Sequence, residues 1–227
     1  MTEVKAREIE EGVKLYYNGD TKRNGEGYWN IMSVYAPQTG CREHDKNDFY
    51  LSLEEAIRSQ VAQGRARDAM GGYAPRAADM LKLKYDCNIE AQAISHASRC
   101  QFQHSRIRGL GENIFYSSNP RFDKASAAKQ ASDMWFGELA TNGVGQNPVF
   151  SMSMTGRPMG KMIGHYTQMV WSRTNAIGCA VQNCRSSTIA VCNYKQQGNV
   201  LSQPIYKVGA ACSACPGGTR CENSLCA

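Results

Sequence analysis

Residues 176–194, AIGCAVQNCRSSTIAVCNY, decide the fold more than any other stretch of the chain. The runs Ala176–Val181 and Thr188–Tyr194 are rich in β-branched residues and flank the polar connection 183–187. This pattern predicts two antiparallel strands joined as a hairpin. A hairpin centred on that connection places Cys179 opposite Cys192. We therefore predict a disulfide across the two strands.

The sequence upstream of the hairpin predicts a first helix at about 48–63 and a second at about 88–100. In the first range apolar side chains recur every four positions, which is typical of one buried helical stripe (Phe49, Leu53, Ile57 and Val61). In the second range we expect one side to pack inward (Ala91, Ile94 and Ser98). His96 then lies on the opposite side, and we predict it at the surface.

A third helix is predicted at about 124–140, with four residues on its inward face (Ala128, Ala131, Trp135 and Leu139). Glu138 falls in the same arc, because three residues past Trp135 bring the helix back to within ~60° of it. A carboxylate on an apolar stripe is costly unless a partner satisfies it. The alternative is that Glu138 lies at the edge of the stripe and reaches water.

Ten cysteines in 227 residues are an even number that could all pair, so we expect five disulfides and a secreted, extracellular protein. The tail 210–227 holds four of them (Cys212, Cys215, Cys221 and Cys226). A zinc site is the alternative for such a cluster, but no histidine is near, which favours disulfides. We expect the tail to keep its shape only through these bridges.

Three parts are expected along the chain: an extension at 1–40, a domain at 41–211 and the cysteine-rich tail at 212–227. The extension has a charged opening that could be helical, followed by the turn-rich stretch 18–27. Four of its aromatic residues could pack on the domain (Tyr16, Tyr17, Tyr28 and Trp29). Residues 1–20 lack the apolar core of a signal peptide. Either a signal has been removed or the sequence starts at a chosen position.

Charge and hydropathy exclude two classes of function. The net charge is +6, but the basic residues are dispersed, without the clusters that nucleic-acid binding favours. No apolar run approaches the ~18–20 residues of a membrane span, so we expect a protein that is not transmembrane. Helices and strands alternate without a glycine-rich phosphate loop, which favours an α/β layered fold over a dinucleotide-binding fold.

Two stretches resemble the signatures of a known family. Residues 164–171, GHYTQMVW, match the first signature of the CAP superfamily at every position, and 189–200, IAVCNYKQQGNV, resemble the second except at Ala190 and Gln196. CQFQHS at 100–105, GENI at 111–114 and WFGE at 135–138 follow the expected order. The chain most resembles nematode secreted venom-allergen-like proteins. It departs from the pattern in the first helix, where Glu54-Glu55 replaces the usual His-Asn pair.

The resemblance implies an α-β-α sandwich followed by a short hinge-like tail, with Cys212 paired to Cys221 and Cys215 to Cys226. It also implies that four residues converge in one cleft (His104, Glu112, Glu138 and His165). Two neutral imidazoles, His104 and His165, could hold a divalent metal, with Zn²⁺ expected to bind weakly and reversibly. The alternative is a hydrogen-bonded polar network that orders the core.

The resemblance further implies a non-enzymatic protein that binds a small hydrophobic ligand, a sterol or fatty acid, or an extracellular host protein. The expected lipid loop lies within 140–164 and is rich in adaptable methionines (Val149, Phe150, Met152, Met154, Met159 and Met162). The alternative for these side chains is to cap the core. The competing function is a metal- or Ser105-dependent hydrolase, but no Gly-x-Ser-x-Gly or His-Glu-x-x-His motif is present. Nothing in the sequence indicates an oligomeric state.

Overall fold

The structure is a computed structural model that describes residues 5–9, 13–17, 47–155 and 161–227. The chain divides into two units, Met1–Gly40 and Cys41–Ala227. In the first unit β1 (Lys5–Ile9) pairs antiparallel with β2 (Val13–Tyr17). The expectation that the charged opening is helical is therefore wrong. Polar and apolar residues alternate at the start of β1 and of β2, which is the period of a strand. The stretch 18–27, Tyr28 and Trp29 lie outside the described residues.

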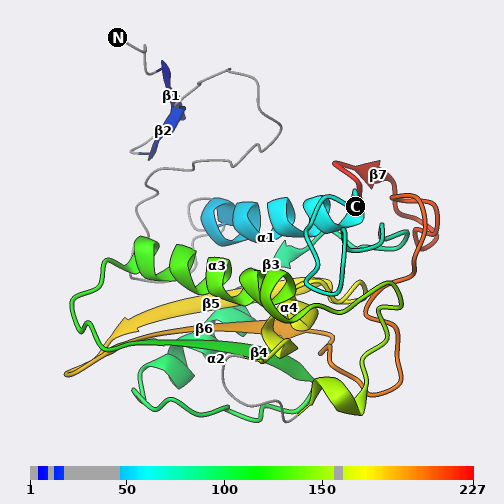
Figure 1. Cartoon of the computed structure of the whole chain (residues 1–227). Helices are drawn as coiled ribbons and strands as arrows, with labels where there is room; N and C mark the ends of the chain where they lie inside the picture. The colour runs from blue at the N-terminus through cyan, green and yellow to red at the C-terminus, as the bar shows by residue number, and fades with distance from the viewer. Residues whose placement is uncertain (1–4, 10–12, 18–46, 156–160) are drawn as a thin grey trace. The chain divides into compact units, whose positions relative to one another are not determined.

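A four-stranded sheet in the order β3-β5-β6-β4 forms the centre of the second unit (Figure 1). Its strands are β3 (Lys84–Tyr85), β4 (Leu110–Ser117), β5 (Ala176–Asn183) and β6 (Thr188–Lys195), of which β3 runs parallel to β5 and the others pair antiparallel. The register of β5 and β6 places Cys179 opposite Cys192, and a disulfide joins them. The predicted hairpin and its bridge are both confirmed.

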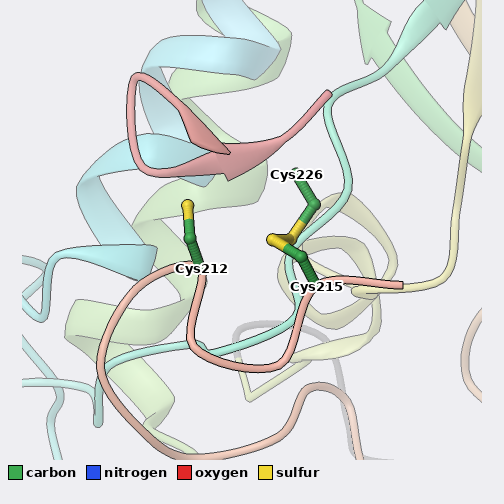
Figure 2. Close-up of side chains that lie close together, drawn as sticks. All are labelled: Cys212, Cys215 and Cys226. Atoms are coloured by element: carbon green, nitrogen blue, oxygen red, sulfur yellow. A yellow bond between two sulfur atoms is a disulfide. The ribbon is translucent and has the colours of Figure 1, made fainter. Parts of the chain in front are cut away.

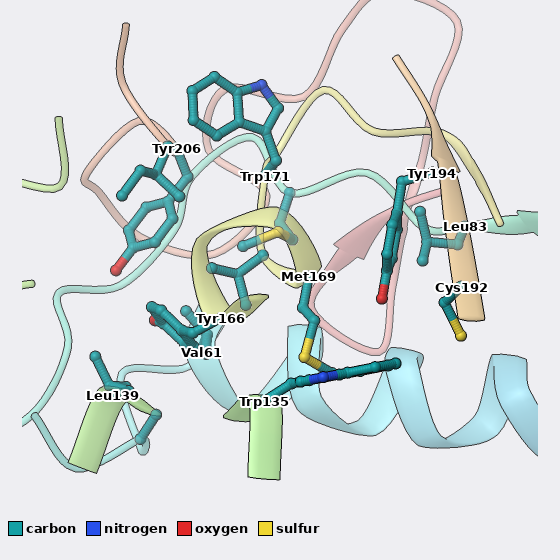
Figure 3. Packing of buried hydrophobic residues seen from close by; sticks show 14 of the residues in the cluster. Val61, Leu83, Trp135, Leu139, Tyr166, Met169, Trp171, Cys192, Tyr194 and Tyr206 are labelled. Carbon is teal, nitrogen blue, oxygen red and sulfur yellow. The ribbon is translucent and has the colours of Figure 1, made fainter. Parts of the chain in front are cut away.

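Helices cover both faces of the sheet. Figure 1 shows α1 (Asn47–Ala62), α3 (Lys124–Asn142) and α4 (Gly164–Met169) on one face and α2 (Cys87–Ala97) on the other. A large apolar core fills the first interface, with Trp135, Met169 and Tyr194 among its members (Figure 3). A smaller core lies under α2. This is the expected α-β-α sandwich. Within the described residues, no helix is long and apolar enough to cross a bilayer.

The first and third helices match their predicted ranges, but the face predicted for α2 is wrong. Ile94 is 48% exposed, whereas His96 is 3% exposed and its Nε2 lies 2.7 Å from the carbonyl oxygen of Gln103. The cause is close contact between α2 and the sheet at Gly178, where an added Cβ would lie 2.2 Å from the backbone nitrogen of Glu90. Small side chains therefore face the sheet (Ala93 and Ala97), and bulky Ile94 turns away.

Arg58 of α1 joins three segments that are distant in sequence. Its fully buried guanidinium donates to five backbone carbonyls at 2.7–3.3 Å (Leu81, Met169, Trp171, Ser172 and Thr174). Burial lowers its pKa to about 10, so it stays charged at neutral pH. One acceptor is the last residue of α4 and three more lie between α4 and β5, so one side chain fixes the connection that follows α4.

Both disulfides implied for the tail are present, Cys212–Cys221 and Cys215–Cys226. The sulfur atoms of Cys212, Cys215 and Cys226 lie within 4.8 Å of one another, but each is oxidised and none is a thiolate that could bind zinc (Figure 2). Cys100 is bonded to Cys184, and Cys87 is also disulfide-bonded.

The tail is held by more than its disulfides, which corrects the expectation from sequence. β7 (Cys221–Glu222) and β8 (Leu225–Cys226) form a small antiparallel pair, and the side chain of Leu225 is fully buried in the main core. The backbone nitrogen of Cys226 donates to the carbonyl of Met80 at 2.8 Å, and that of Lys82 donates to the carbonyl of Cys226 at 2.9 Å. The tail therefore completes the core of the second unit.

We predict that Arg58→Lys lowers the free energy of unfolding by about 3 kcal/mol or more, because one ammonium cannot reach five carbonyls and the abandoned ones stay buried. Urea denaturation measures the change. Lys129→Ala, which removes an exposed pair with Asp133, should change it by less than about 1 kcal/mol. A similar small effect for Arg58→Lys would contradict the prediction.

Candidate functional site

Glu138 and His165 form a close pair between α3 and α4. Glu138 Oε1 lies 2.6 Å from His165 Nδ1, and its Oε2 accepts from the backbone nitrogens of His165 and Tyr166 at 3.0 Å each. The carboxylate thus orients the imidazole and also satisfies two backbone donors of the first turn of α4, which have no partner within the helix. This contact supplies the partner that the inward position of Glu138 requires.

The ring of His165 is also fixed from one side by an aromatic neighbour. The indole of Trp135, one turn before Glu138 on α3, stacks on it with ring centroids 5.9 Å apart and an angle of 16° between planes. Only 16% of the His165 side chain is exposed. Neighbouring residues of one helix therefore provide both the hydrogen-bond acceptor and the packing surface for this imidazole.

His104 and Glu112 form a second pair at the edge of the sheet. Glu112 lies on β4, and its Oε1 is 3.0 Å from His104 Nδ1 and accepts from the backbone nitrogen of Ser105 at 2.8 Å. Burial raises the pKa of Glu112, but the hydrogen bonds from His104 and Ser105 together lower it by more than burial raises it. The net shift of the pKa is therefore downward and favours the carboxylate. His104 itself is 58% exposed, so this pair opens to solvent.

The two pairs are connected through Asn113, the residue after Glu112 on β4. Its Nδ2 donates to the backbone carbonyl of His165 at 3.1 Å. In the described part of the chain, no set of three His, Cys, Asp or Glu ligand atoms lies within 4.8 Å except the tail cysteines. The structure therefore shows two His–Glu pairs joined through a backbone contact, and the convergence of all four residues in one cleft stays a prediction.

The donor chemistry of the two pairs suits a divalent metal. In both imidazoles Nδ1 faces a carboxylate, and Nε2 has no hydrogen bond within the described ranges. Metal-binding histidines commonly use this arrangement, in which a carboxylate holds one ring nitrogen and leaves the other for the ion. Two imidazoles are fewer than the three or four protein ligands typical of zinc sites, so the fit is to a weak site.

The residues expected in the lipid loop occupy different environments. Phe150 is 4% exposed and packs edge-on against Trp171, with ring centroids 6.3 Å apart, so it belongs to the core. Met152 is 70% exposed in the short 3₁₀ helix η1 (Met152–Met154), whereas Met154 packs against the core and Val149 is partly buried. Met159 lies outside the described residues.

Sequence reasoning missed the residues that hold His165 from the sheet side. Asn113 is buried, and the same Nδ2 that contacts His165 also donates to the hydroxyl of Tyr194 at 3.4 Å. The stretch GENI at 111–114 contains this asparagine, but the family resemblance assigns a role only to its glutamate. The signal available in the sequence was an asparagine beside apolar residues that could form a strand. If that asparagine is buried, its amide requires hydrogen-bond partners.

The fold is an α-β-α sandwich that carries several disulfide bridges. Such bridges are typical of the class of cysteine-rich proteins found in oxidising environments. The sequence profile of the family described as CAP, the cysteine-rich secretory protein family, matches residues 55–194. The chain belongs to this family.

Similar proteins include secreted nematode and mammalian relatives. The chain is 48% identical to Ancylostoma secreted protein from Ancylostoma caninum over 178 residues, which cover 77% of this chain and 42% of the relative. It is 34% identical to Peptidase inhibitor 16 from Homo sapiens over 205 residues, 86% of this chain and 39% of the relative. The chain thus spans about two fifths of the length of these relatives.

Solved structures of nematode proteins share the fold. The crystal structure of Na-ASP-1 is 42% identical with a TM-score of 0.78, covering 85% of this chain and 52% of that chain. The crystal structure of NaASP2 with Zn²⁺ is also 42% identical, with a TM-score of 0.76, covering 85% of this chain and all of that one. The similarity therefore extends over most of the second unit.

We predict that Glu138→Ala destabilises the protein by about 2–3 kcal/mol, because the two backbone donors of α4 and the ring nitrogen of His165 lose their carboxylate partner. Denaturation gives the free energy, and amide hydrogen exchange should accelerate at His165 and Tyr166. Asp133→Ala, an exposed truncation on the same helix, is the matched control and should cost less than about 1 kcal/mol. Unchanged exchange at both amides would refute the capping role of Glu138.

Proposed function

We propose that this chain is a secreted, non-enzymatic CAP protein that binds a divalent metal, Zn²⁺ in the first instance, weakly and reversibly through His104 and His165. The observation that carries the proposal is the shared geometry of the two imidazoles. Each gives Nδ1 to a glutamate, at 3.0 Å for His104 and 2.6 Å for His165, and keeps Nε2 for a ligand. Bound Zn²⁺ would supply a Lewis acid at this position.

Two further observations support the proposal. A protein 42% identical to this chain has been crystallised with Zn²⁺. The disulfides suit an extracellular protein, and relatives carry the names Ancylostoma secreted protein and Cysteine-rich venom protein. We extend secretion to this chain on that basis. Release of metal on acidification is expected, because imidazole must be neutral to bind it.

The surroundings of Ser105 favour binding over hydrolysis. A nucleophilic serine needs its hydroxyl beside an imidazole that can take the proton. Here the hydrogen bonds of Ser105 are directed to the carboxylate of Glu112, which has a lowered pKa, and His104 uses Nδ1 for the same carboxylate. The hydrolase alternative therefore lacks the hydroxyl–imidazole contact that it needs.

A second candidate function is binding of a small hydrophobic ligand, a sterol or fatty acid, at η1. The observation that favours it is the exposure of Met152, a flexible apolar side chain that adapts to varied ligands. Phe150 is committed to the core and is not part of this proposal. An extracellular host protein is a further possible occupant of the same exposed segment.

For the metal site, we predict that His104→Gln and His165→Gln each weaken Zn²⁺ binding at least ~10-fold, since losing one of two ligands removes most of the affinity. Isothermal titration calorimetry at neutral pH measures the affinity. His96→Gln is the matched control, because a glutamine amide can keep the bond to Gln103 and leaves both ligands intact. Equal affinities for all four proteins would rule out this site.

For the hydrophobic ligand, we predict that Met152→Ser weakens binding of a fluorescent sterol about 10-fold or more, because burial of the methionine contributes about 1.5 kcal/mol or more. Met134→Ser, a change of similarly exposed methionine on α3, serves as the control and should have no effect. If both variants bind sterol as the unmodified protein does, η1 is not the binding segment.

A further inference from the structure

A chain of buried hydrogen bonds runs from α1 to the backbone of His165. The hydroxyl of Tyr194 on β6 donates to Oε1 of Glu54 at 3.0 Å. Asn113 on β4 donates through Nδ2 to that hydroxyl at 3.4 Å and to the carbonyl of His165 at 3.1 Å. Glu54, Tyr194 and Asn113 are each at most 2% exposed, so water does not compete with the chain.

The chemistry of the groups fixes the direction of these bonds. A carbonyl oxygen only accepts and an amide nitrogen only donates, so Asn113 is the donor to both His165 and Tyr194. The hydroxyl of Tyr194 then accepts from Asn113 and gives its own hydrogen to Glu54. A change in the strength of the bond between Tyr194 and Glu54 therefore polarises the hydroxyl of Tyr194. Through that hydroxyl it also polarises the amide of Asn113, which donates to His165.

Glu54 is the group in this chain that can change its charge. Its Oε2 is buried and has no hydrogen-bond partner among the residues that the structure describes. Arg58, one turn later, directs its donors to backbone carbonyls, and no ion pair joins the two side chains in the described part of the chain. Burial raises the pKa of Glu54 to about 7, against the smaller opposing effects of Tyr194 and Arg58, the titratable or charged groups that face it.

The two charge states of Glu54 act differently on the chain. A neutral carboxyl offers Tyr194 an ordinary acceptor, whereas a carboxylate forms a charge-assisted bond that is shorter and roughly twice as strong. The stronger bond makes the hydroxyl oxygen a better acceptor for Asn113 and restrains the amide that donates to His165. The start of α4 is then held more firmly from the sheet side.

We propose that Glu54 is a positioning residue for His165, acting through Tyr194 and Asn113, so that its charge state tunes how firmly the imidazole is presented. The proposal deepens the metal-binding function proposed above and rests on it for its effect on Zn²⁺. It belongs to this chain in particular, because Glu54 stands where the family resemblance leads one to expect histidine.

The test compares Zn²⁺ affinity across pH for the unmodified protein, Glu54→Gln, Tyr194→Phe and the double variant. Glutamine keeps an oxygen for Tyr194 but does not titrate. We expect equal affinities for the unmodified protein and Glu54→Gln in acid, and an advantage of about 3-fold for the unmodified protein as the pH rises past about 7. In the Tyr194→Phe background, Glu54→Gln should have no further effect, because the chain is already broken.

Two results would overturn the proposal: superimposable pH profiles for the unmodified protein and Glu54→Gln, or an undiminished effect of Glu54→Gln when Tyr194 is phenylalanine. Unfolding is followed in parallel to separate positioning from stability. Because the folded-state pKa of Glu54 is raised from 4.5 to about 7, the unmodified protein should lose stability relative to Glu54→Gln as the pH rises through this window.

A metal-free readout separates this proposal from the proposed function. NMR of the apo protein should show the backbone amide of Tyr166, which follows the His165 carbonyl, shifting with pH in step with Glu54 in the unmodified protein. The Glu54→Gln protein should lack that component. If Zn²⁺ fails to bind but the component is present, the metal function fails and the positioning role stands. If the component is absent, the positioning role fails whatever the metal does.

Discussion

A buried guanidinium must keep its hydrogen-bond acceptors, and this constraint on Arg58 organises the second unit. Its five carbonyl partners include Met169 at the end of α4 and Thr174 just before β5. These hydrogen bonds restrain the backbone that connects α4 to β5. Withdrawing any of these carbonyls would leave buried charge poorly satisfied. Since α4 begins with the residues around His165, the position of the candidate site depends on an arginine that never touches it.

Glu138 shows how one side chain can serve folding and function together. One of its oxygens orients the imidazole of His165, and the other satisfies backbone nitrogens at the start of α4. Glu112 repeats half of this arrangement, with a ring nitrogen and a backbone nitrogen on the same oxygen. Both imidazoles are therefore oriented by carboxylates that also bind local backbone nitrogens.

The spacing of apolar residues and cysteines along the chain was enough to predict structure within single elements and between neighbouring strands. The β5–β6 hairpin, its Cys179–Cys192 bridge and the inward stripe of α3 followed from spacing alone, while the tail bridges followed from family resemblance. The prediction for the inward face of α2 was wrong, because the close contact at Gly178 leaves room only for small side chains and Ile94 faces outward. The distance between helix and sheet causes this, and the sequence of the helix alone does not contain it. The links between Glu54, Tyr194 and Asn113 join three elements far apart in sequence, so no motif could show them.

The Cys100–Cys184 bridge spans 84 residues and ties the loop that carries His104 to the far end of the β5–β6 hairpin. Because Cys100 follows α2 and Cys184 follows β5, the bond links the end of the helix on one face of the sheet to the connection of the hairpin. The loop 101–109 is therefore tethered at both ends, by this bond at its start and by β4 at its end, although His104 itself stays 58% exposed. Reduction of this bond would release the start of the loop while Glu112 stays on β4, so we expect the His104–Glu112 contact to depend on the redox state of a cysteine pair that includes neither residue.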